Sequence, residues 1–204
     1  MNKLTRYRIK LAAATLLLGA AASAKGAEAT ATPIPQSLRV PDGNTLYLKG
    51  NATGTQNYVC VPGISGPFWK FLGPQATMFV TLPWFGGEIR QQLATHYLSA
   101  NPAEEGTPRP AWQHSIDTSA VWAKPIATFT DPPVAPGAIP WLLLEVAGSQ
   151  SGPAGGSTLR RTTYIQRLNT SGGTAPVSGC DAAKYGAVAL VPYSTDYYLY
   201  KSEK

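Results

Sequence analysis

The chain of 204 residues is 44% hydrophobic, which is enough for one domain with a substantial buried core. Its 17 lysines and arginines outnumber its 11 acidic residues, but four of these basic residues lie within the first ten positions, and without them 13 remain. A charge so close to neutrality, with no run of lysine or arginine, excludes nucleic acid or an anionic membrane surface as the expected partner.

Residues 1–24 have the pattern of a secretory signal peptide. The basic segment MNKLTRYRIK precedes the apolar run LAAATLLLGAAA, and Ala22-Ser23-Ala24 supplies small residues where a signal peptidase cleaves. The apolar run is too short for the roughly 20 residues of a membrane-spanning helix, which disfavours an uncleaved anchor. No cysteine follows this run, which excludes a lipid-modified N-terminus. We therefore expect a periplasmic or secreted protein that has no stable membrane insertion after cleavage.

Residues 25–37, rich in alanine, threonine and proline, predict a flexible leader before a domain of residues 38–204. In that domain glycine and proline recur about every ten residues, which leaves little room for helices. The segments between them are short and rich in β-branched and aromatic residues: TLYL, TQNYVCV, ATMFVTLPW, WLLLEVA, TTYIQRL, AVALVPY and TDYYLY. This spacing predicts a single all-β domain, an antiparallel sandwich or barrel.

In TQNYVCV, strand alternation places Gln56, Tyr58 and Cys60 on one face, which we expect to be buried. An inward glutamine needs a hydrogen-bond partner for its amide, because leaving a buried donor unpaired costs about 1–3 kcal/mol. We expect the backbone of a neighbouring loop to supply this partner, and a ligand contact is the alternative. Cys60 and Cys180 are the two cysteines of the chain. An exported chain with two thiols predicts a disulfide between them, and two unrelated buried thiols are the alternative.

The segment EIRQQLATHYL fits two structures, because Ile89, Leu93 and Tyr97 are spaced as on a helix face and also alternate as in a strand. It follows a predicted strand and the turn Phe85-Gly86-Gly87, so we expect the second arm of a hairpin. The proline-rich segments 99–111 and 130–140 predict loops, and the glycine-rich segment 148–157 predicts a long, flexible hairpin tip.

The segment AWQHSIDTSAVW, residues 111–122, combines a histidine, an aspartate and two serines. Members of a catalytic triad come from separate elements, so their closeness in sequence is weak evidence of catalysis. A turn in which Asp117, Thr118 and Ser119 bond their own backbone is the favoured interpretation. A metal site of His96, His114 and Asp117 is geometrically possible, but no ligand spacing requires it, so we predict no metal.

Other classes of chemistry leave few signals in the chain. No glycine-rich phosphate-binding pattern occurs, so no nucleotide cofactor is expected. No pair among Glu88, Asp117, Glu145, Asp181 and Asp196 stands out as the carboxylates of a glycosidase. Glu145 lies within an apolar run and would have a raised pKa if buried. The favoured alternatives are a position at the outward-facing end of a strand, or a pair with an arginine such as Arg161 or Arg167.

The five tryptophans are a better-founded lead, because aromatic side chains on an exposed surface can stack on sugars or apolar ligands. We expect Trp141 in the core. Trp112 and Trp122, which lie in a proline-rich region, are expected to be exposed.

Several short motifs span nearly the whole domain. They are Gln56-x-Tyr58-x-Cys60, Thr95-His96-Tyr97, Trp112, Asp117-x-Ser119-x-Val121, Pro140-Trp141-Leu142-Leu143-Leu144, Tyr164-Ile165-Gln166-Arg167-Leu168-Asn169-Thr170, Gly172-Gly173, Pro176, Gly179-Cys180 and Tyr193-x-x-Asp196-Tyr197-Tyr198. Together they resemble DUF3455, a family of secreted bacterial and fungal proteins. The resemblance implies an uncharacterised activity. Some members carry a malate dehydrogenase label, but this sequence lacks the dinucleotide-binding pattern that such an activity requires.

The family-like positions also imply a candidate binding site of five residues: Gln56, His96, Trp112, Asp117 and Arg167. The alternative is a buried hydrogen-bond network that ties the two cysteine-bearing ends together. The leading hypothesis is a protein that binds a small molecule or glycan. The alternatives are a hydrolase using His96 with Asp117 or Glu145, and a structural envelope or interaction protein. The sequence does not decide whether the protein is an enzyme, nor its oligomeric state.

Overall fold

The computed structural model describes residues 33–204. The predicted signal peptide and most of the predicted leader lie outside these residues. In the described part of the chain, no helix is long and apolar enough to cross a membrane.

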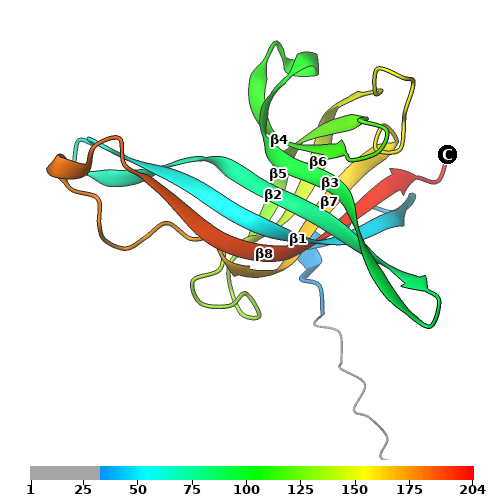
Figure 1. Ribbon diagram of the computed structural model, residues 1–204, viewed down its shortest axis with the longest axis horizontal. Helices are drawn as coiled ribbons and strands as arrows, with labels where there is room; N and C mark the ends of the chain where they lie inside the picture. Colours follow the sequence, from blue (N-terminus) through cyan, green and yellow to red (C-terminus); the bar gives the residue numbers. More distant parts are fainter. Residues whose placement is uncertain (1–32) are drawn as a thin grey trace, which may run out of the picture. The chain divides into compact units, whose positions relative to one another are not determined.

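Eight antiparallel strands form one sheet in which each strand pairs with the next along the chain. β8 also pairs with β1, so the sheet closes into a barrel (Figure 1). The all-β prediction is confirmed, and of its two forms the protein adopts the barrel. The strands are β1 (Asn44–Val61), β2 (Phe68–Trp84), β3 (Gly87–Asn101), β4 (Thr107–His114), β5 (Ala120–Phe129), β6 (Trp141–Gln150), β7 (Thr162–Gly172) and β8 (Val188–Ser202). Three single-turn 3-10 helices are η1 (Gln36–Leu38), η2 (Pro102–Glu104) and η3 (Ala182–Lys184).

Two pairs of predicted segments are each one long strand. TLYL and TQNYVCV both belong to β1, and AVALVPY and TDYYLY both belong to β8. The glycines between the first two segments do not break β1. A Cβ at Gly54 would lie 2.1 Å from the Gln75 carbonyl oxygen, and one at Gly50 would lie 2.7 Å from the Met78 side chain. These glycines permit close approach of β1 and β2 inside a continuous strand.

The ambiguous segment EIRQQLATHYL is strand β3, and it forms the predicted hairpin with β2. The prediction of a loop over 99–111 is wrong. Ser99 pairs with Arg109 in the β3–β4 ladder, and only η2 and the residues around it make the turn. β4 pairs with β5 at only three residues, and Pro108 and Pro110 lie outside them. The edge of β4 that faces β5 makes no ladder bonds at these prolines, so their lack of a backbone N–H is tolerated. The loop predicted over 130–140 is present between β5 and β6.

The barrel interior is filled at one end by a hydrophobic cluster. Its fully buried members include Ala52, Met78, Val121, Ile165 and Leu159. Leu159 comes from the loop between β6 and β7, so that loop inserts a side chain into the end of the barrel. The glycine-rich part of the loop packs against the β4–β5 turn instead of forming a free hairpin tip.

A second cluster covers the outer face of the sheet. Leu38 of η1 is fully buried against Trp141, Leu143 and Leu168, and its carbonyl oxygen accepts a bond of 2.6 Å from the Gln166 amide. The expectation of a core position for Trp141 is therefore confirmed. The chain before β1 is thus fastened to the outside of β6 and β7.

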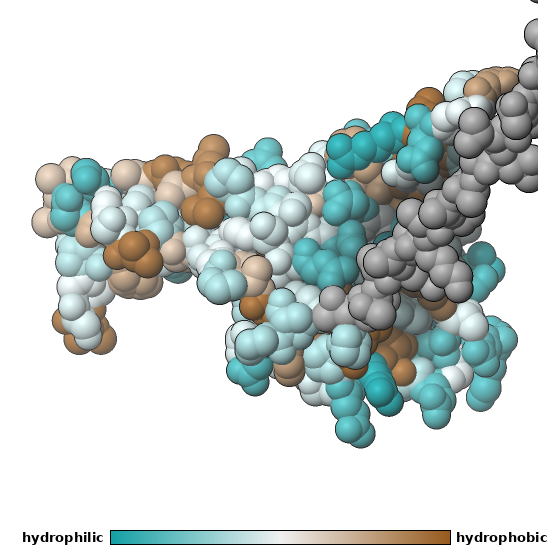
Figure 2. Space-filling model, turned by 90° about the horizontal axis from the view of Figure 1, so that it is seen from below, coloured by the Kyte–Doolittle hydropathy of each residue, from teal (hydrophilic) through white to brown (hydrophobic). Residues whose placement is uncertain are grey.

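β1, β2 and β8 continue together beyond the other strands as an arm, on the left of Figure 1. The predicted disulfide joins Cys60, near the end of β1, to Cys180, which lies in the connection that precedes η3. Apolar residues are exposed along this arm (Figure 2), among them Phe68, Leu72 and Leu190. The bridge therefore fastens the β7–β8 connection to a part of the sheet that has little core of its own.

Candidate functional site

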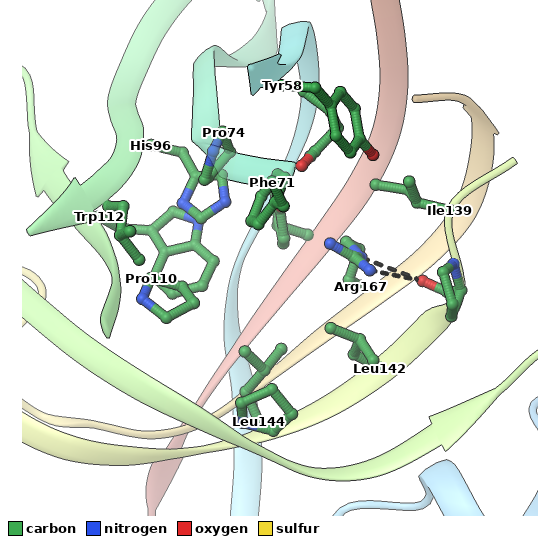
Figure 3. Close-up of a pocket in the computed structure, with 15 residues that line it drawn as sticks. Tyr58, Phe71, Pro74, His96, Pro110, Trp112, Ile139, Leu142, Leu144 and Arg167 are labelled. Carbon is green, nitrogen blue, oxygen red and sulfur yellow. Dashed lines mark hydrogen bonds between the residues drawn. The ribbon is translucent and has the colours of Figure 1, made fainter. Parts of the chain in front are cut away.

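A cavity of ≈ 290 Å³ lies inside the barrel next to the hydrophobic cluster (Figure 3). Every one of the eight strands contributes at least one side chain to its wall. Trp112, Leu144 and Tyr197 line the cavity and also belong to the cluster, so they form its floor. Phe71 and Leu98 line it and remain partly exposed. The cavity is therefore the part of the barrel interior that the core leaves unfilled.

Four of the five predicted binding residues line this cavity: Gln56, His96, Trp112 and Arg167. They come from β1, β3, β4 and β7, which are far apart in sequence. Asp117 is not among the lining residues. Strand alternation explains the grouping, because each of the four side chains points to the inner face of its strand.

His96 and Trp112 are opposite one another in the β3–β4 ladder, and their rings stack with centroids 4.2 Å apart. The edge of Tyr197 closes on both rings. The pKa of His96 is lowered to about 3, mainly by burial; the hydrogen bond to Ala111 opposes this shift, and the nearby charge of Arg167 adds to it. The imidazole is therefore neutral at pH 7.

The tautomer of His96 follows from its one hydrogen bond. His96 Nδ1 lies 2.9 Å from the Ala111 carbonyl oxygen, which can only accept, so Nδ1 carries the proton. Nε2 then holds a lone pair, and it has no hydrogen-bond partner among residues 33–204. His96 thus offers the cavity one hydrogen-bond acceptor.

Arg167 supplies the charge of the cavity. Its Nε and Nη2 donate to the Pro140 carbonyl oxygen at 3.1 and 2.8 Å, which fixes the guanidinium beside the loop before β6 (Figure 3). Burial raises the pKa of Tyr58 and of Tyr197, and the positive charge of Arg167 opposes the rise at both hydroxyls. The cavity therefore has a positive potential around these groups.

Several polar atoms at the cavity are buried without a hydrogen bond of good geometry. They are Gln56 Nε2, Trp112 Nε1 and the Tyr197 hydroxyl, with the Tyr193 hydroxyl nearby. Gln56 is only 3% exposed, and its amide nitrogen has no hydrogen-bond partner within the described chain. The prediction that its amide would be satisfied by a neighbouring loop is wrong. A buried polar group left in this state costs stability, and a ligand can supply the partner.

Asp117 holds the β4–β5 turn instead of lining the cavity. Its Oδ1 accepts from the backbone and hydroxyl of Ser119, and its Oδ2 accepts from the backbone and hydroxyl of Thr158. Burial opposes ionisation of Asp117, but the bonds from Thr158 and Ser119 outweigh it and hold its pKa well below the usual range. The turn predicted for Asp117 and Ser119 is present, and it also fixes the loop that carries Leu159.

The hydrolase pairs expected for His96 are not assembled. Asp117 lies against His114, with Nδ1 and Oδ1 2.9 Å apart, while His96 bonds to the Ala111 backbone. Glu145 is half-exposed and pairs with Lys124 at 3.3 Å, so the expected arginine partner is wrong. No group of three histidine, cysteine or acidic side chains within residues 33–204 could hold a metal ion.

The expectation of exposed tryptophans at 112 and 122 is wrong. Trp112 is 1% exposed and Trp122 is 6% exposed. Both lie in the β4–β5 ladder, in a region whose prolines suggested loops. Trp112 faces the interior, whereas Trp122 packs on the opposite face with Ala111, Ala120 and Tyr97.

Sequence reasoning did not select Tyr197 and Phe71 as site residues. Alternation along β8 would have placed Tyr197 on the same face as Tyr193 and Thr195, all of which are buried. Phe71 follows a register shift in the β1–β2 ladder, so no simple alternation identifies its face.

A family model described as "Protein of unknown function (DUF3455)" matches residues 41–201. This span includes every lining residue of the cavity and all of the strands except the last residue of β8, Ser202. No curated protein and no solved structure matches the chain.

Proposed function

The chain belongs to the DUF3455 family, whose function is unknown, and we propose that it binds one small, largely apolar molecule inside its barrel. The observation that carries the proposal is the interior cavity with its unpartnered polar atoms. A binding role, and not catalysis, suits a cavity in which no carboxylate contacts the buried histidine.

The dimensions of the cavity favour a single small ligand. Its volume of ≈ 290 Å³ is at the lower end of the roughly 300–1,000 Å³ of small-molecule sites. Eight-stranded barrels are just wide enough to hold one small ligand. Of the two ligand classes expected from the sequence, a small molecule therefore fits better than a glycan, because a chain of sugars needs a longer groove.

The composition of the wall supports the same proposal. Most lining side chains are aliphatic, aromatic or proline, and the polar ones are few: Gln56, His96 and Arg167, together with the hydroxyls of Tyr58 and Tyr197. Small-molecule sites combine apolar walls with a few polar groups that orient the ligand.

We place this binding function in the periplasm or outside the cell. The disulfide between Cys60 and Cys180 and the absence of a membrane-spanning helix in the described chain are compatible with such a location. The signal peptide expected over residues 1–24 is the basis of this assignment.

Ligand binding can be tested by thermal shift and tryptophan fluorescence across a panel of small metabolites. We expect some members to raise the melting temperature and to change the emission of Trp112, which lies at the floor of the cavity. The variants Trp112→Phe and Trp122→Phe form a matched pair, since both side chains are buried and neither indole N–H has a partner.

Trp122→Phe should retain the ligand-dependent fluorescence change, and Trp112→Phe should lose it. A panel that leaves both signals of the wild-type protein unchanged would contradict the proposal. A change that depends on Trp122 and not on Trp112 would place the ligand outside the barrel.

An interaction role is a second candidate, favoured by the turn between β2 and β3. Trp84 and Phe85 are 59% and 94% exposed there, and they contact each other edge to face. If this turn mediates self-association, sedimentation should show oligomers of the wild-type protein that the double variant Trp84→Ser/Phe85→Ser does not form. Monomers in both samples would refute it.

A further inference from the structure

The cavity wall carries positive charge and no negative charge. The wall contains one cation, Arg167, and no acidic side chain. Gln56 Nε2, Trp112 Nε1 and the Tyr197 hydroxyl add hydrogen-bond donors without partners. The side-chain acceptors at the cavity, among them His96 Nε2 and the Gln56 amide oxygen, are all neutral. A site rich in donors and positive charge is suited to an anionic ligand.

On the basis of the proposed binding function, we propose that the ligand is a monocarboxylate with an apolar body, and that its carboxylate lies against Arg167. The apolar body then occupies the space bounded by Leu142, Leu144, Phe71 and Trp112. The carboxylate replaces the water that an uncompensated guanidinium would otherwise retain.

Arg167 is prepared for such a ligand. Two of its five N–H donors bond to the Pro140 carbonyl oxygen, through Nε and Nη2. These bonds hold the guanidinium in place before any ligand arrives. The remaining donors, on Nη1 and Nη2, keep the planar arrangement that binds a carboxylate with two parallel bonds.

No side chain of the described chain neutralises Arg167. The ion pairs formed within residues 33–204 use Arg109, His114, Lys124 and Lys184, each with its own carboxylate. Arg167 is partly buried and has no carboxylate partner within the described chain, so an anion that enters the cavity can pair with its charge. Tyr58 and Tyr197 line the same cavity as Arg167, and its charge opposes the rise in the pKa of both hydroxyls.

The number of charges selects a carboxylate over a phosphate group. A phosphate monoester carries close to two charges and needs several cations or a row of backbone donors. Here one guanidinium is surrounded by neutral donors and apolar walls. One cation matches one carboxylate, and the apolar walls match a hydrocarbon or aromatic body.

The test compares carboxylates with their neutral amides, which have nearly the same size and shape. The probes are phenylacetate with phenylacetamide and octanoate with octanamide, titrated into the purified protein by calorimetry. The wild-type protein should bind the carboxylate of at least one pair about tenfold more tightly than its amide, or more.

Three variants test whether Arg167 causes this preference. Arg167→Gln should bind the carboxylate and the amide with equal affinity. Arg167→Lys should retain part of the preference, because the charge remains and the planar fork is lost. Arg161→Gln removes an exposed arginine and serves as the control for net charge, so it should behave as the wild type.

The outcomes separate this inference from the proposed function. Equal affinity of the wild-type protein for carboxylates and amides would overturn the inference and leave the binding function standing. No binding of any probe would overturn the inference, and the metabolite panel then decides the binding function separately. If circular dichroism shows that Arg167→Gln is unfolded, Arg167→Lys decides: an unchanged preference there assigns the carboxylate to another residue.

Discussion

His96 is a titratable side chain whose chemistry is set by its surroundings. Its pKa of about 3 in the folded protein lies below the ordinary value of 6.5, mainly because burial disfavours the charged ring. Between these two values the unfolded chain binds the proton more readily than the folded chain. The contribution of neutral His96 to the free energy of unfolding is therefore complete above pH 6.5, and it is lost as the pH falls from 6.5 toward 3.

The change His96→Gln should flatten this dependence. For the wild-type protein we expect the free energy of unfolding to fall between pH 7 and 5 with a slope that approaches about 1.4 kcal/mol per pH unit. Urea unfolding at pH 7, 6 and 5 measures it. Glu104 and Asp117 also have lowered pKa values, but their ordinary values of 4.5 and 3.8 put their effect below this range. Equal slopes for both proteins would contradict the assignment.

Asp117 is the residue whose role differs most from the sequence-based hypothesis. It connects the β4–β5 turn to Thr158, and the next residue, Leu159, is fully buried in the core and bonds through its backbone N–H to Ser119. A carboxylate that accepts four hydrogen bonds from Ser119 and Thr158 is a structural anchor.

We expect Asp117→Asn to lower the free energy of unfolding by about 2–4 kcal/mol, because the amide replaces an acceptor oxygen by a donor. Chemical denaturation measures the loss. Asp42→Asn is the control, because Asp42 is exposed and its carboxylate has no partner within the described chain. A catalytic Asp117 would instead give a stable, folded variant.

At the scale of an element, β1 depends on glycines that let it approach β2. Gly54→Ala should lower the free energy of unfolding by about 1–3 kcal/mol, since the added methyl group would collide with the Gln75 backbone and Ala76. Gly87→Ala is the matched control in β3: the nearest atom to its added Cβ is 3.7 Å away. Thermal unfolding of both should show a loss for the first variant alone.

β4 and β5 illustrate how tertiary context changes the meaning of proline. Their ladder has only three paired residues, and Pro110 and Pro125 lie beyond it and line the cavity. In the sequence these prolines suggest a loop. In the structure they lie in the parts of β4 and β5 where the two strands no longer pair with each other. Because no β4–β5 hydrogen bonds form at Pro110 and Pro125, the missing backbone N–H of each proline costs no ladder bond there.

At the scale of the whole molecule, the disulfide closes a long loop of the chain. Cys60 and Cys180 are 120 residues apart, and the intervening chain includes six of the eight strands in full. The double variant Cys60→Ser/Cys180→Ser should lose about 4–5 kcal/mol of unfolding free energy, because the unfolded chain gains the freedom of that loop.

Denaturation with and without reductant measures this loss. The wild-type protein should be destabilised by reductant to the level of the double variant, and the double variant should not respond. If reductant leaves the wild-type transition unchanged, the bridge contributes nothing to stability.

The sequence by itself determined the all-β class, the inward face of Gln56, Tyr58 and Cys60, and the pairing of the two cysteines. Each of these depends on local alternation or on the number of thiols, which are visible in the chain. The resemblance to DUF3455 also implied five site residues, of which Gln56, His96, Trp112 and Arg167 line one cavity, because their side chains lie on the inner face of the closed sheet.

Only the tertiary structure decided that the sheet closes as a barrel and that Asp117 is separate from the cavity. Closure depends on β8 pairing with β1, a contact between the two ends of the domain that no local pattern encodes. Asp117 lies apart from the cavity because its Oδ2 accepts a hydrogen bond from Thr158, which is 41 residues away in the sequence. The burial of Trp112 likewise depends on neighbours from other strands, since an indole is exposed or enclosed according to what packs over it.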